Sequence, residues 1–199
     1  MPGLVKDLPG FAHIARYRAN GRTIAKILPG EYYVTRGQEL LATVLGSCVA
    51  ACVRDVTIGI GGMNHFMLPA SGGSADRWGG PLGKATRYGT AAMEQLINDI
   101  LKYGGRWERL EVKIFGGSKV LARMRDVGES NIRFVREYIA REGLPLVAAD
   151  VGGASPRNVL YCPHTGEALV RRLGAVRHAD VAAQEHSYLR DLQGVAHGR

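Results

Sequence analysis

The chain has 199 residues, of which 46% are hydrophobic and 22% are charged, a composition typical of one soluble globular domain. No apolar run approaches the roughly 20 residues of a bilayer-spanning helix, and the first residues lack the apolar core of a secretion signal. We therefore expect a cytoplasmic protein with no direct membrane insertion.

The formal net charge of +8 indicates an acidic partner, which a charge alone cannot identify as nucleic acid, anionic lipid or protein. The basic residues are scattered and carry no aromatic stacking pattern, which argues against nucleic acid. The chain has three cysteines, Cys48, Cys52 and Cys162, an odd number that indicates free thiols in a reducing cytosol.

The first third of the chain predicts strands after an irregular start. Residues 1–29 are basic and weakly patterned, so we predict an N-terminal arm there. Short apolar runs then predict strands at 32–35, 39–45, 48–54 and 58–68, the third of them buried on both faces. Glycine, serine and proline residues predict a loop over 70–83.

The remainder predicts helices that alternate with strands. Apolar spacing predicts a helix over 84–103 and a second over 131–142, which Ser130 or Asn131 would cap. Further strands are predicted at 110–115, 146–151, 158–162 and 168–172, the last two as a hairpin. This order predicts an α+β domain over 30–172, with sheets in the middle and two principal helices outside. Residues 173–199 are predicted to form a C-terminal tail, helical around 180–192, in which nothing signals chemistry.

The chemically informative stretch runs from Thr43 to His65. Gly46 and Ser47 form a sharp turn before Cys48, where a nucleophilic thiol could be presented beside backbone N–H groups that receive an oxyanion. His65 follows 17 residues later, a spacing that places two antiparallel strands side by side. Thr43 is the nearest upstream residue that could orient the imidazole.

Each of these residues also has a plain structural interpretation. Cysteine is among the most buried residue types, so Cys48 could be a core residue, and Cys52 on the same strand face is predicted to be one. A zinc site made of Cys48, Cys52, His65 and His164 is disfavoured, because the cysteines lack the short CxxC spacing. Arg157, in the glycine-rich stretch 150–157, could bind either a loop carbonyl or a partner's carboxylate.

At these residues the sequence resembles the chemoreceptor glutamine deamidases of the CheD family. The matching segments run from about residue 26 to 173, a span that is most of the chain, and they stand in the family's order. They are KILPGEYYV from Lys26, LGSCVA from Leu45, GGMNHFMLP from Gly61, FGG from Phe115, and DVGG from Asp150 with Pro156-Arg157 after it.

The resemblance implies a layered α/β sandwich similar to that of the cytotoxic-necrotizing-factor deamidases. It also implies a triad of Cys48, His65 and Thr43, and it makes a core role for Cys48 much less tenable. Around the triad we predict an oxyanion and substrate cleft formed by Gly46, Ser47, Gly62 and Asn64. A partner-binding surface is predicted at Gly152, Gly153 and Arg157.

The implied activity is hydrolysis of glutamine side chains to glutamate on the cytoplasmic helices of chemoreceptors (methyl-accepting chemotaxis proteins). No metal or organic cofactor is required. The same chemistry would also cleave a glutamate methyl ester. An alternative is a regulatory subunit that binds a CheC-type chemotaxis phosphatase, and this alternative predicts an inert active site.

Overall fold

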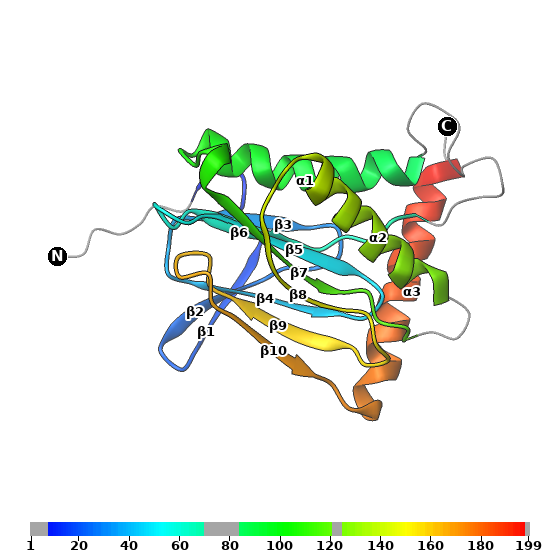
Figure 1. The fold of residues 1–199 in the computed structure, drawn as a ribbon. Coiled ribbons are helices and arrows are strands. Elements are labelled where there is room, and N and C mark those ends of the chain that lie inside the picture. Colours follow the sequence, from blue (N-terminus) through cyan, green and yellow to red (C-terminus); the bar gives the residue numbers. More distant parts are fainter. Residues whose placement is uncertain (1–7, 70–83, 121–124, 198–199) are drawn as a thin grey trace.

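The computed structural model describes residues 8–69, 84–120 and 125–197. The loop predicted for 70–83 lies outside these residues. Three layers make up the fold (Figure 1): one five-stranded sheet, here called the first sheet, then another five-stranded sheet, the second sheet, and then two helices. A third helix, α3 (Ala175–His197), crosses the ends of both sheets.

The first sheet has the strand order β1-β2-β4-β9-β10 and is mixed, because β2 and β4 run parallel. Its other neighbours pair antiparallel, including the predicted hairpin of β9 and β10. The strands are β1 (Ala15–Ala19), β2 (Arg22–Lys26), β4 (Leu40–Leu45), β9 (Arg157–Tyr161) and β10 (Ala168–Arg172).

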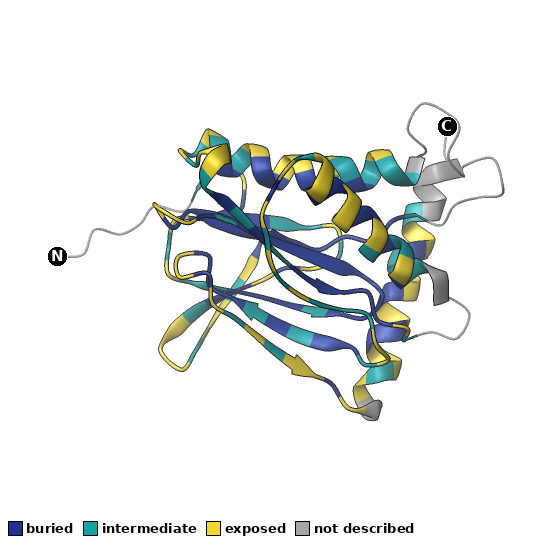
Figure 2. Ribbon diagram, viewed as in Figure 1, coloured by how far each residue is buried: buried dark blue, intermediate teal, exposed yellow. Residues whose placement is uncertain are grey.

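The second sheet has the order β3-β6-β5-β7-β8 and is also mixed, because β7 and β8 run parallel. It contains β3 (Tyr32–Thr35), β6 (Gly61–Asn64), β5 (Val49–Asp55), β7 (Leu110–Gly116) and β8 (Leu146–Val151), and the short 3₁₀ helix η2 (Trp107–Arg109) precedes β7. The central strand β5 is almost wholly buried, as its apolar sequence predicts, because the helices cover one face and the first sheet the other (Figure 2).

Helices α1 (Lys84–Lys102) and α2 (Arg125–Arg141) pack on the outer face of the second sheet. Their inward side chains, among them Leu96, Ile100, Val135 and Ile139, join the apolar core of the sheets. Because α2 connects the parallel strands β7 and β8, this part is a βαβ unit. None of the helices within 8–69, 84–120 and 125–197 is both long and apolar enough to cross a bilayer.

Several sequence predictions at the level of elements differ from the structure; of the strand predicted at 58–68, for example, only β6 at Gly61–Asn64 forms. The irregular lead-in predicted for residues 1–29 is wrong for 15–26, which form the hairpin of β1 and β2 around Asn20-Gly21. The cap predicted at Ser130 or Asn131 is also wrong, because α2 already begins at Arg125 and both residues lie inside it. The expectation of two principal helices omits α3, which is the longest of the described helices.

Candidate active site

The turn Gly46–Cys48 carries the chain from β4 in the first sheet to β5 in the second. All three of its carbonyl groups accept hydrogen bonds from the surrounding structure. These bonds are Ser118 N to Gly46 O at 2.7 Å, Asn131 Nδ2 to Ser47 O at 2.8 Å and Gly117 N to Cys48 O at 2.7 Å. With its carbonyls held in this way, the turn directs its three N–H groups together to the other side, the arrangement that binds anions.

An anionic group does occupy this position, and it comes from α3. The buried carboxylate of Glu185 accepts hydrogen bonds from all three N–H groups of the turn, those of Gly46 at 2.8 Å, Ser47 at 2.7 Å and Cys48 at 3.1 Å. The hydroxyl of Ser47 donates a fourth hydrogen bond to it at 2.7 Å. Four donors compensate for much of the cost of burying a carboxylate.

His65 follows β6 directly, and Thr43 on β4 holds its ring. Thr43 Oγ1 lies 2.8 Å from His65 Nδ1 and donates to the carbonyl of Ile27 at 2.8 Å. Because a hydroxyl has one hydrogen and Ile27 O can only accept, Thr43 must accept from His65 Nδ1–H. The proton is thereby assigned to Nδ1, and Nε2 is left with its lone pair.

Cys48 and His65 meet at the junction of the two sheets. The Cys48 sulfur, a ring nitrogen of His65 and a carboxylate oxygen of Glu185 all lie within 4.8 Å of one another. His65 Nε2 is buried and has no hydrogen-bond partner among the described residues. An unpartnered basic nitrogen near a thiol can take up a proton when the thiol reacts.

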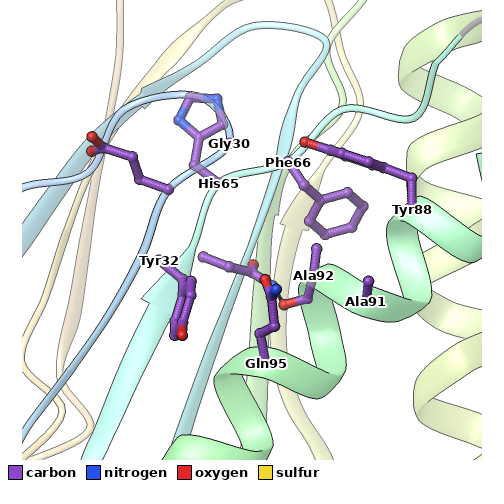
Figure 3. Close-up of a pocket in the computed structure, with 10 residues that line it drawn as sticks. Gly30, Tyr32, His65, Phe66, Tyr88, Ala91, Ala92 and Gln95 are labelled. Carbon is purple, nitrogen blue, oxygen red and sulfur yellow. Dashed lines mark hydrogen bonds between the residues drawn. The ribbon is translucent and has the colours of Figure 1, made fainter. Parts of the chain in front are cut away.

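His65 also lines a pocket of about 280 Å³. Figure 3 shows His65 at its end, with Tyr32, Tyr88 and Gln95 around it. Tyr88 also forms a hydroxyl–hydroxyl hydrogen bond with Tyr188 of α3. The pocket therefore leads towards the site where α3 is docked.

Burial governs the ionisation of the site. It raises the pKa of the Cys48 thiol well above its usual value, and the negative charge of Glu185 raises it further. Burial also lowers the pKa of His65 to about 4, although Glu185 and the Ile27 carbonyl oppose this shift. With α3 in place, both pKa shifts favour a neutral thiol and a neutral imidazole.

The other predicted cleft residues differ in their placement. Gly46 and Ser47 belong to the anion-binding turn. Asn64 lines the pocket, but its amide is engaged by Ala51 N at 2.8 Å and Ala92 O at 3.0 Å, which tie β5 and β6 to α1. Gly62 lies against β3 and α1, where a Cβ atom would come within 2.2 Å of Tyr33 O.

Arg157 is buried, and its guanidinium binds groups inside the protein. Of the two predicted roles, the structure therefore supports binding of a loop carbonyl rather than of a partner's carboxylate. Its guanidinium donates to the carbonyls of Asp150 and Gly152, to Asp150 Oδ1 at 2.7 Å and to Ser118 Oγ at 2.9 Å. Gly152 N in turn donates to Gly116 O at 2.8 Å. These contacts brace the loop that supports the Cys48 turn.

Metal ligation was a possible use of these residues. Among the described residues, Cys48, His65 and Glu185 are close enough to share an ion. Cys52 and His164 do not join this group, and Cys52 is a fully buried core residue, as predicted. The Glu185 carboxylate already accepts hydrogen bonds from the N–H groups and the hydroxyl of the turn. These contacts are typical of an anion-binding site rather than of a zinc site.

Sequence reasoning missed two residues of the site, Glu185 and Asn131. Glu185 lies in the tail, where the sequence signalled no chemistry, yet the structure places its carboxylate beside Cys48 and His65. A signal was present in the spacing of Val181, Ala182, Glu185 and Leu189, which puts a carboxylate in the middle of an apolar helix face.

Comparisons with known proteins give one family. The family model described as CheD chemotactic sensory transduction matches residues 67–172. A protein of Halorhodospira halophila named "Probable chemoreceptor glutamine deamidase CheD" is 53% identical over 188 residues, which cover 93% of this chain and 87% of that protein. A protein of Hahella chejuensis with the same name is 50% identical over 190 residues, covering 94% and 88%. A solved structure, Bacillus licheniformis YfiH, aligns with a TM-score of 0.38 at 16% identity over 63% of this chain and 50% of its own.

Proposed function

The chain belongs to the CheD family, and on that basis we propose that it hydrolyses glutamine side chains of chemoreceptors to glutamate, with Cys48 as the nucleophile. The observation that carries this proposal is the meeting of three converging N–H groups, a thiol and a tautomer-fixed imidazole at one turn. Acyl transfer by a thiol needs these three parts. Because the target helices lie in the cytoplasm, the proposal also places the enzyme there.

The reaction would proceed in two steps. The Cys48 sulfur attacks the carboxamide carbon and gives its proton to His65 Nε2, while the N–H groups of Gly46–Cys48 hold the oxyanion. The carbon–nitrogen bond breaks, and His65 returns the proton to the leaving ammonia. Water then attacks the thioester, its proton passing to His65, and the products are glutamate and the free thiol.

Thr43 supplies the orientation in this scheme. By accepting from Nδ1–H it keeps Nε2 free to receive the proton, so the Cys-His-Thr assignment is part of the proposal. The Cys-His-Thr assignment is also the basis on which we propose that the fold is similar to that of the cytotoxic-necrotizing-factor deamidases. Methyl ester hydrolysis would use the same groups, with methanol as the leaving group.

Removing the thiol tests the proposal. The cytoplasmic fragment of a chemoreceptor from the same organism would be incubated with the wild type or with Cys48→Ala, and its peptides weighed. Each converted glutamine gains about 1 Da, and we expect this gain with the wild type only. Cys52→Ala is the matched control, since Cys52 is an equally buried thiol four residues further along, in β5. A gain that persists in Cys48→Ala would refute the assignment.

The alternative of a binding subunit for a CheC-type phosphatase stays a prediction. The assembled site favours an enzyme, because the alternative expects an inert one. Arg157 is buried, so any docking at 150–157 would use the exposed part of this loop. Binding of a CheC-type phosphatase by Cys48→Ala, measured by calorimetry, would test this role separately from catalysis.

A further inference from the structure

A charged residue stands in the middle of the buried face of α3. Val181, Ala182 and Leu189 are buried on this face, and Glu185 is buried between them, with Tyr188 and Leu192 packed beside it. The opposite face is exposed, including Gln184 and His186. An apolar residue at 185 would be expected if α3 served only to cover the sheets, so the carboxylate needs another explanation.

The position of this carboxylate provides one. It occupies the N–H groups that, under the proposed function, hold the oxygen of the substrate carboxamide. Glutamate is the product of that reaction, and it differs from glutamine only by an oxygen in place of the amide nitrogen. Glu185 therefore lies where the product side chain would lie, next to Cys48 and His65.

A catalytic role for Glu185 fits the contacts poorly. A carboxylate at this place blocks the donors that an oxyanion needs, and its charge raises the pKa of the thiol that must ionise. Both effects hold the enzyme in a resting state. The Gly46–Cys48 turn binds the Glu185 carboxylate in the way that it would bind a ligand. Gly46 and Ser47 of this turn are residues that the sequence predicted for the substrate cleft.

Helix α3 also makes contacts at the pocket beside His65. The Tyr188 hydroxyl bonds to that of Tyr88 and covers Gly30, where a Cβ atom would come within 2.8 Å of it. Gly30 and Tyr88 both line the pocket beside His65. As Figure 1 shows, α3 runs across the ends of both sheets. Its side chains reach the Cys48 turn through Glu185 and the pocket residue Tyr88 through Tyr188.

We propose that α3 is an internal product mimic: it closes the active site by inserting Glu185, and a receptor helix that carries glutamine binds in its place. This inference rests on the proposed function and adds a regulation of the same site. It also specifies the substrate as a helix that presents its glutamine from the side, since a helix is what the site holds here.

A single substitution turns the mimic into a substrate. In Glu185→Gln, Cys48 is expected to attack the new carboxamide at position 185 of its own chain, releasing ammonia with loss of about 17 Da. Water then restores Glu185, for a net gain of about 1 Da over the variant as translated. The peptide that holds position 185 also holds the exposed Gln184, which is expected to remain unchanged and serves as an internal control. Glu185→Gln combined with Cys48→Ala is expected to keep both glutamines.

The same preparations would be assayed on the receptor fragment, so that two kinds of failure separate. Receptor conversion by Glu185→Gln, with the carboxamide at position 185 unmodified, overturns the α3 inference and leaves the proposed function standing. If neither the receptor nor position 185 is converted, and the wild type also leaves the receptor unchanged, the proposed function fails. Accessibility of the thiol then decides only whether α3 covers Cys48.

Accessibility is measured through alkylation by iodoacetamide. Leu189→Asp places a charge in the buried face of α3 without touching the site and is expected to speed Cys48 alkylation at least about 10-fold. Arg190→Asp, next to it on the exposed face, is the matched control and should react like the wild type. Equal rates in all three proteins, with α3 helicity retained by circular dichroism, would overturn the inference.

Discussion

At the scale of single residues, the hydroxyl of Thr43 decides which nitrogen of His65 carries the proton. Thr43→Ala removes the acceptor of Nδ1–H, so we expect kcat for deamidation to fall about 10- to 100-fold with little change in KM. Thr43→Ser keeps the hydroxyl and should retain most of the rate. Thr35→Ala is the control, because Thr35 is equally buried but bonds to Glu39 instead. A Thr43→Ala enzyme with normal kcat would contradict the orienting role.

Asn131, in α2, holds the Cys48 turn. Its amide donates to Ser47 O at 2.8 Å and accepts from Leu68 N at 2.9 Å, and it is fully buried. Asn131→Asp keeps the acceptor and removes the donor, so we expect a loss of kcat of about 10-fold with altered Cys48 alkylation rates. Glu137→Ala, on the exposed face of the same helix, should change neither quantity. If Asn131→Asp behaved like Glu137→Ala, the turn would not depend on this bond.

The sequence predicted the parts of the site that are local and missed those that are distant. Cys48, His65 and Thr43 lie within 22 positions of one another, and strand spacing was enough to bring them together. Glu185 lies 137 positions from Cys48, so only the three-dimensional path of α3 brings it there. Asn131 was expected as a cap because asparagine is a poor residue for a helix interior. In the structure its buried hydrogen bonds outweigh that preference.

At the scale of elements, the loops after β7 and β8 support the Cys48 turn through Arg157. Arg157→Ala leaves Ser118 Oγ and the carbonyls of Asp150 and Gly152 without their buried donor, so we expect a loss of about 3 kcal/mol of unfolding free energy. Arg172→Ala is the matched control: Arg172 bonds to the same carboxylate at 3.1 Å, but its side chain is 68% exposed. We expect it to cost less than about 1 kcal/mol. Urea unfolding would measure both, and equal costs would contradict a bracing role.

The elements that the sequence predicted well are those with strong periodic patterns. β3, β8 and β10 have the predicted bounds, and α1 ends one residue before its prediction, because apolar runs or a helical apolar period mark these elements in the sequence. β1 and β2 were missed because basic residues interrupt them, at Arg16, Arg18, Arg22 and Lys26, so neither strand shows a continuous apolar run in the sequence. The Asn20-Gly21 pair was a sequence signal for this hairpin, because Asn-Gly favours a two-residue hairpin turn. In the structure the two residues have φ values of 49° and 75°, as such a turn requires.

At the scale of the whole molecule, the site lies where two sheets and three helices meet, and this position couples its chemistry to stability. Burial lowers the pKa of His65 to about 4, from 6.5 in the unfolded chain. Between these values the unfolded state binds a proton that the folded state does not. Folding stability must therefore fall as the pH decreases through this range.

Removing His65 isolates this effect from the other acid-sensitive groups. We expect the wild type to lose up to about 3 kcal/mol more unfolding free energy than His65→Asn between pH 6.5 and 4, as measured by urea unfolding at each pH. The loss should shrink in Leu189→Asp, because an undocked α3 lets water reach the imidazole and brings its pKa towards the ordinary value. A wild type and a His65→Asn variant with parallel pH profiles would mean that His65 is hydrated in solution. The closed arrangement of α3 over the site would then not be the resting state of the protein.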